Sequence, residues 1–161
     1  MTQHSSRLLG VLVVAMIVLA GCGWGTPPAM RTVDFSADEV TQVEIYMYEY
    51  MSEQAMVELA VITDPEAVED LVEYYTDLEL GIPDQEQLAQ QIAGQPAAGM
   101  RFILTDGATF EVTQVRGVDA AVIIFWPDQD PWVARSGIDH HSLIGSTDQV
   151  DASEVPPAEL P

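Results

Sequence analysis

The best candidates for metal ligands in this 161-residue chain are two adjacent histidines. His140 and His141 follow Asp139, and an imidazole there could bind a metal ion together with Asp139 or Asp130. Neighbouring side chains on a strand point in different directions, so only a loop could bring either histidine beside a carboxylate. We therefore regard His140 and His141 as weak metal candidates, and a solvent-exposed loop as the more ordinary interpretation.

The sequence offers little that could support catalysis. Ser142 follows His141, but adjacency in the chain is not the geometry of a serine–histidine pair. A Gly-x-Ser-x-Gly motif, a phosphate-binding glycine loop and a His-Glu-x-x-His motif are all absent from the sequence. The chain has 26 acidic residues, so almost any two could be proposed as an acid–base pair. We expect a protein that is not an enzyme, with no catalytic residue and no cofactor.

Three tyrosines at alternate positions form the strongest candidate for a binding surface. The alternation over residues 40–50 predicts a strand with apolar side chains on one face and Tyr46, Tyr48 and Tyr50 on the other. If the apolar face packs on the core, this tyrosine stripe faces outward, where rigid amphipathic rings suit a glycan or a protein partner. A second layer over the tyrosines, such as a short helix, is the alternative.

The only cysteine, Cys22, directly follows Leu19-Ala20-Gly21 at the end of an apolar run. That run begins after Arg7 and is too short to span a hydrocarbon core, which needs about 20 residues. A short apolar run behind a positive charge, ending in small residues, is typical of a secretory signal peptide. The residues leading up to and including Cys22 resemble the lipobox of bacterial lipoproteins.

This resemblance implies that residues 1–21 are a signal peptide and that Cys22 is the lipid attachment site. Cleavage before Cys22 and its acylation, palmitate included, would hold the protein in the cell membrane on the extracytoplasmic side. The resemblance covers only the leader and says nothing about the fold. The alternative is a secreted protein with an incidental thiol, although a lone cysteine in an oxidising compartment is a liability.

The charge balance excludes some partners. Five arginines, no lysine and 26 acidic residues give a net charge of −21. Such a surface repels nucleic acid and anionic lipid, so we expect no nucleic-acid partner. Cationic surfaces, divalent ions and neutral glycans are compatible partners, and solubility in a salty or acidic exterior is the plainer explanation of the charge.

Composition divides the chain after the leader into three parts. Residues 22–38 contain glycine and proline with little periodicity and are predicted to be a flexible tether. Residues 39–144 are predicted to form a single folded domain. Residues 145–161 are rich in proline and acids and are predicted to be a disordered tail.

Most of the predicted domain consists of strands. Residues 40–50 and 56–61 alternate and predict a hairpin, and residues 100–104 and 109–115 flank Asp106-Gly107, the strongest hairpin signal in the chain. Residues 120–126 are apolar on both faces, which predicts a central strand. Residues 132–134 are expected to add an edge strand.

One long helix is predicted after the first hairpin. Asp64 can cap it, Pro65 suits its first position, and Val68, Leu71, Val72, Tyr75 and Leu78 fall on one face. Gly81 and Pro83 are expected to end it, and residues 84–92 to form a second short helix. We therefore predict an α+β domain of order β-β-α-β-β-β, with one long amphipathic helix packed on an antiparallel sheet of about five strands.

These observations favour a lipid-anchored protein whose small domain binds a protein or a cell-envelope component through its sheet face. The alternative is an accessory lipoprotein that binds a small ligand or a metal ion. A bare apolar sheet face without a pocket would favour the first. A cavity lined by tyrosine, tryptophan or methionine, or a histidine within coordination reach of carboxylates, would favour the second.

Overall fold

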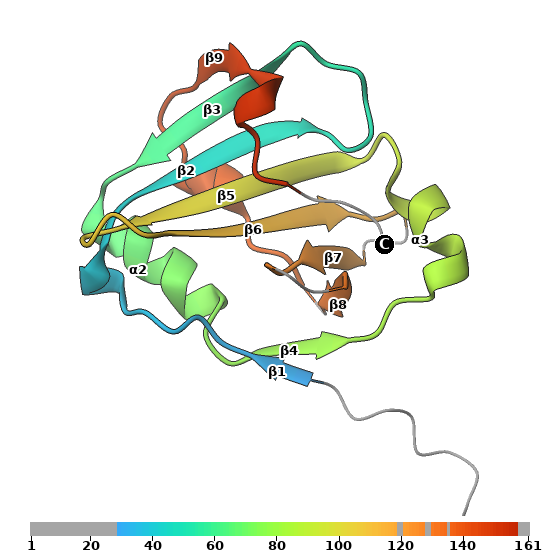
Figure 1. Ribbon diagram of the computed structural model, residues 1–161, viewed down its shortest axis with the longest axis horizontal. Coiled ribbons are helices and arrows are strands. Elements are labelled where there is room, and N and C mark those ends of the chain that lie inside the picture. The colour runs from blue at the N-terminus through green and yellow to red at the C-terminus, as the bar shows by residue number, and fades with distance from the viewer. Residues whose placement is uncertain (1–28, 119–120, 128–129, 135, 158–161) are drawn as a thin grey trace, which may run out of the picture.

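A computed structural model of the protein describes residues 29–118, 121–127, 130–134 and 136–157. These residues form a nine-stranded sheet in which all neighbouring strands run antiparallel, with two short α-helices (Figure 1). The predicted signal peptide and Cys22 lie outside the described residues.

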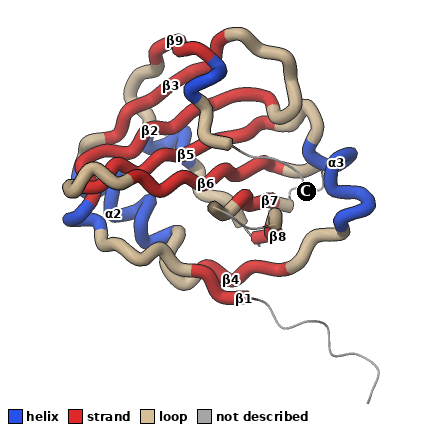
Figure 2. The backbone as a smooth tube through the Cα atoms, in the orientation of Figure 1, coloured by secondary structure: helices blue, strands red, loops and turns tan. Residues whose placement is uncertain are grey.

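The strand order across the sheet is β1-β4-β8-β7-β6-β5-β2-β3-β9. The strands are β1 (Ala29–Arg31), β2 (Val40–Glu49), β3 (Met56–Ile62), β4 (Leu78–Gly81), β5 (Pro96–Leu104), β6 (Thr109–Arg116), β7 (Val122–Phe125), β8 (Trp132–Ala134) and β9 (Asp148–Asp151). The α-helices are α2 (Pro65–Tyr74) and α3 (Gln85–Ile92), and the 3-10 helices are η2 (Ala37–Glu39), η3 (His140–Leu143) and η4 (Ala152–Glu154). Figure 2 shows how the sheet curves between its two edge strands, β9 and β1.

Two predicted hairpins are confirmed. Strands β2 and β3 pair antiparallel, and so do β5 and β6. In the second turn Gly107 adopts a φ of 87°, a left-handed conformation that glycine takes at no steric cost. The Asp106 carboxylate accepts a hydrogen bond of 2.9 Å from the backbone N–H of Ala108, which fixes the turn.

The predicted fold class is wrong. The molecule is mostly one nine-stranded antiparallel sheet with two short helices, not a five-stranded sheet under one long helix. Helix α2 ends at Tyr74, because Asp77 takes a φ of 53°, outside the helical region, and residues 78–81 then pair as β4 with β1 and β8. Leu78 and Leu80 alternate with Glu79 and belong to that strand. The second short helix is present as α3.

Two short strands lie where the sequence predicts no strand, and a third, which is predicted to be an edge strand, lies inside the sheet. Within the predicted tether of residues 22–38, residues 29–31 form β1, and Val33 and Phe35 are buried in the core. Within the predicted tail of residues 145–161, β9 pairs with the edge of β3. Strand β8 lies between β7 and β4 and is not an edge.

One face of the sheet, here called the inner face, carries Val43 and Ile45 of β2 and packs against α2, which lies behind the sheet in Figure 1. Val68, Leu71 and Val72 of α2 are buried in this core. Helix α2 begins where expected, because the Asp64 carboxylate accepts a 3.1 Å hydrogen bond from the backbone N–H of Ala67. The sequence thus determines the start of this helix and its buried face, although not its length.

The opposite face, here called the outer face, has its own apolar cluster. Leu88 and Ile92 of α3 pack there with Tyr50 and Phe125, whose rings stack with centroids 5.3 Å apart. The segment that follows β9 crosses in front of β5 in Figure 1. Pro156 of this segment is buried. The sheet is therefore covered on both sides.

Candidate functional site

The structure covers most of the tyrosine stripe. Tyr46 is 1% exposed and Tyr50 is 4% exposed, whereas Tyr48 is half-buried. Tyr50 packs in the cluster with α3, and the chain near Pro156 lies close to Gly99, the β5 residue opposite Tyr46. The second layer that we considered as the alternative is therefore the arrangement found, and the stripe is not a bare surface.

Tyr46 belongs to a network centred on Arg101. The Tyr46 hydroxyl donates to Glu44 Oε2 (2.7 Å) and accepts from Arg101 Nη1 (2.8 Å). Arg101 also pairs with Glu44 at 3.2 Å and with Glu111 at 2.6 Å, and its Nη2 donates to the backbone carbonyl of Glu154 at 3.0 Å. Burial, and then the Glu44 carboxylate, raise the pKa of Tyr46 to about 12. These contacts join β2, β5 and β6 to the C-terminal segment, so their role is structural.

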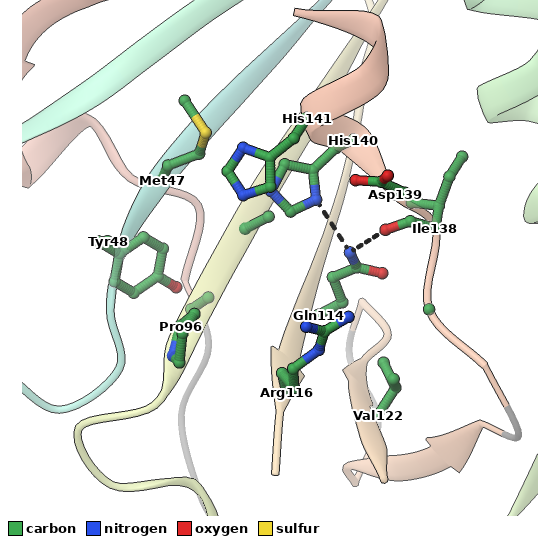
Figure 3. A pocket seen from close by; sticks show the side chains of 13 residues that line it. Met47, Tyr48, Pro96, Gln114, Arg116, Val122, Ile138, Asp139, His140 and His141 are labelled. Carbon is green, nitrogen blue, oxygen red and sulfur yellow. Dashed lines mark hydrogen bonds between the residues drawn. The ribbon is translucent and has the colours of Figure 1, made fainter. Parts of the chain in front are cut away.

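A pocket of about 390 Å³ lies at one end of the inner face (Figure 3). Its floor is made by side chains of four adjacent strands, among them Met47, Ala98, Gln114 and Arg116. Its other wall is the segment of residues 137–141, which leads into η3. The pocket therefore lies between the sheet and a loop that is distant from the floor in sequence.

Strand register explains why polar groups reach this pocket. Val112, Gln114 and Arg116 alternate along β6, so all three project from the inner face. Val112 is buried in the core, Gln114 is 7% exposed, and Arg116 is exposed at the strand end. Gln114 lies opposite Ala98 of β5, whose small side chain leaves space beside it. The face thus changes from apolar to cationic along one strand.

The side chain of Gln114 fixes His140. Gln114 Nε2 donates to the backbone carbonyl of Ile138 at 3.0 Å and lies 3.2 Å from His140 Nδ1, as the dashed lines in Figure 3 show. Because the carbonyl can only accept, the amide nitrogen must face it. In a neutral His140 ring, the contact of this nitrogen with Nδ1 favours the tautomer that carries its proton on Nε2.

Electrostatics agree with a neutral His140. Burial lowers the pKa of His140 and the neighbouring His141 lowers it further, whereas Asp139 and a hydrogen bond to the Ile138 backbone oppose these effects. The two imidazole rings lie with centroids 4.5 Å apart. The described residues contain no group of three or more His, Cys, Asp or Glu side chains placed to hold one metal ion. His140 and His141 thus line the pocket beside Asp139, with Gln114 and Arg116 as their other polar neighbours.

Sequence reasoning missed Gln114 and Arg116 as site residues. The signal that could have found them is their position on the predicted strand, at alternate residues on the same face as Phe110 and Val112. A polar side chain on the core face of a strand needs a partner. For Gln114 that partner comes from residues 138–140, which no local pattern connects to β6.

Comparison with known proteins gives no relative: no family model matches the sequence, and no curated protein or solved structure matches it. Neither helix of the described residues has the length and apolar character needed to cross a bilayer.

Proposed function

We propose that this protein is a lipid-anchored accessory protein that binds a small ligand in the inner-face pocket on the extracytoplasmic side of the membrane. The pocket is the observation that carries the proposal. Its volume of about 390 Å³ lies within the range of about 300–1,000 Å³ that is usual for small-molecule sites. Apolar side chains and a few convergent polar groups, the composition usual for such sites, line it.

The lipid anchor in this proposal depends on the sequence before Cys22, which resembles a lipobox. The proposal of a protein or cell-envelope partner bound by the whole tyrosine stripe has less support, because Tyr46 and Tyr50 are buried. A second candidate surface remains around Tyr48, where Tyr50, Val155 and Pro156 also line a cavity of about 290 Å³ on the outer face. A short segment of a protein partner would be the occupant there.

Binding without catalysis is the simpler role for the inner-face pocket. Among the described residues, its lining contains no serine, threonine or cysteine that could act as a nucleophile beside His140. Asp139, the only carboxylate among the described lining residues, is exposed and has no second carboxylate beside it with which to form an acid–base pair. We therefore propose a ligand carrier or sensor, not an enzyme.

The first test is to block the pocket. Pro96 lines the pocket but is exposed, so Pro96→Trp should fill the space without removing core contacts. Thermal unfolding of the full chain in detergent should be measured with a panel of small acids, each paired with its uncharged counterpart. Compounds that bind should raise the Tm. A ligand at about 100 times its Kd stabilises the folded state by about 2.7 kcal/mol, which shifts the Tm by several degrees.

The matched control is Val61→Trp, which places the same side chain at an exposed position of β3 outside the pocket. We expect Pro96→Trp to abolish the Tm shifts and Val61→Trp to retain them. The proposal fails if no compound stabilises the unmodified chain, or if Pro96→Trp responds as the unmodified chain does.

A further inference from the structure

The basic side chains that the structure describes are concentrated at the inner-face pocket. The net charge is −21, and the described residues include five basic side chains, those of Arg31, Arg101, Arg116, His140 and His141. Three of the five, Arg116 and both histidines, line the pocket. The surface of the molecule is strongly negative, so a pocket with this lining differs from its surroundings.

Arg116 is available to a ligand in a way that the other two described arginines are not. Arg101 is neutralised by Glu44 and Glu111. Arg31 lies over the ring of Trp132, with its guanidinium carbon 5.0 Å from the ring centre. Among the described residues, Arg116 forms no ion pair, and it is exposed at the end of β6. A guanidinium in this state can bind a carboxylate or a phosphate through two parallel hydrogen bonds.

His140 adds a second donor in a fixed position. Its Nδ1 is held by Gln114, whose own orientation is set by the Ile138 carbonyl. In the tautomer that this contact favours, Nε2 carries the proton and is a hydrogen-bond donor on a ring that lines the pocket. The ring needs no change of tautomer to donate from Nε2, because the contact with Gln114 already favours this form.

We propose that the pocket takes a small anionic ligand, with carboxylate or phosphate oxygens bound by Arg116 and oriented by the Nε2–H of His140. This inference rests on the proposed function. The acidic surface opposes it, but charges beyond a Debye length of about 8 Å at physiological ionic strength are largely screened, whereas the contact with Arg116 is direct. Asp139, the only carboxylate among the described lining residues, is exposed, so the surrounding water weakens its repulsion of a bound anion.

The test compares ligands that share one sugar skeleton, with and without an anionic group. Calorimetric titration of the full chain in nonionic detergent should use glucose 6-phosphate with glucose, and gluconate with gluconamide, so that one arm carries a phosphate and the other a carboxylate. We expect at least one anion to bind ten or more times tighter than its neutral counterpart. Arg116→Gln should remove that preference, and Arg116→Lys should restore part of it.

Arg31→Gln serves as the control, because it removes one positive charge outside the pocket. It should leave the preference for the anion unchanged. Equal binding of neutral and anionic partners, or an Arg116→Gln chain that keeps the preference, would overturn the inference. If neutral compounds bind and Pro96→Trp blocks them, the ligand class is wrong but the proposed function stands. If neither pair binds and no compound of the thermal panel does, both fail.

Discussion

At the scale of single residues, one amide determines the state of the pocket. Gln114 is nearly buried and contacts both the Ile138 carbonyl and His140. Because a carbonyl cannot donate, it selects the orientation of the amide, and the amide in turn selects the histidine tautomer. Protonation of His140 at Nδ1 would place two donors against each other. This contact therefore agrees with burial in favouring the neutral ring.

Gln114→Glu should reverse this preference. A carboxylate at this position can accept from a protonated Nδ1, and a neighbouring negative charge favours the imidazolium. The pKa of His140, which burial lowers in the unmodified protein, should then rise above its ordinary value of about 6.5. NMR titration of the histidine ring protons measures this directly.

Gln149→Glu is the matched control, because it makes the same change at an exposed position of β9. Its His140 should titrate as in the unmodified protein. An unchanged His140 pKa in Gln114→Glu would contradict the assigned hydrogen bond.

At the scale of elements, the C-terminal segment acts as a third layer of the fold. Strand β9 extends the sheet, and the backbone N–H of Ala152 donates to the carbonyl of Ala55 at 3.0 Å. The backbone carbonyl of Glu154 accepts a hydrogen bond from Arg101. Pro156 then lies against Gly99 of β5. A Cβ on Gly99 would be crowded, because it would lie 3.0 Å from Pro156 Cδ and 3.4 Å from Thr113 Oγ1, so a neighbour would have to shift by a few tenths of an ångström.

Gly99→Ala should therefore loosen the C-terminal segment. The proline ring is stiff, so the segment must move away from the new methyl group, and we expect a loss of about 1–3 kcal/mol in the free energy of unfolding. Hydrogen exchange at residues 149–155 should accelerate more than exchange in β2. Gly145→Ala is the control, since a Cβ there meets nothing within 4 Å and should change neither quantity. Unaltered exchange in Gly99→Ala would show that the segment packs differently.

The sequence predicts the parts of this fold that depend on neighbouring residues. The turn at Asp106 and Gly107 and the start of α2 at Asp64 are local, and both are found as expected. Leu78 misled the prediction, because it follows Tyr75 by three residues and so can continue the helix face, whereas in the structure it begins the alternation of a strand. Strands of three or four residues such as β1, β8 and β9 are too short to show a period. Their pairing is decided by contacts distant in sequence.

The candidate site depends even more on long-range structure. Alternation along the predicted strand places Gln114 and Arg116 on one face, but the loop that makes the face into a pocket comes from residues 137–141. The sequence shows the histidines only as an adjacent pair. In the structure, the orientation of His140 depends on its contact with the Gln114 amide, which no local pattern predicts.

At the scale of the whole molecule, the proposed lipid anchor and the ligand pocket are independent features. Cys22→Ser should prevent acylation, because the hydroxyl cannot replace the thiol as the lipid acceptor. Metabolic labelling with radioactive palmitate should show that the label is lost. Membrane fractionation should show that detergent is no longer needed to release the protein from membranes. Gly23→Ala, which retains the thiol, should label normally. Undiminished labelling of Cys22→Ser would contradict the proposed attachment site.

The position of β1 restricts how such an anchored protein can stand on a membrane. Six residues separate Cys22 from Ala29, the first residue of β1. Even fully extended, a chain of this length reaches about 25 Å, less than the width of a small domain. The β1 edge would therefore remain next to the lipid headgroups, and free rotation would be limited. Strand β9, at the far end of the sheet, would point away from the bilayer. A large molecule approaching from the aqueous side would then meet the acidic β9 edge first.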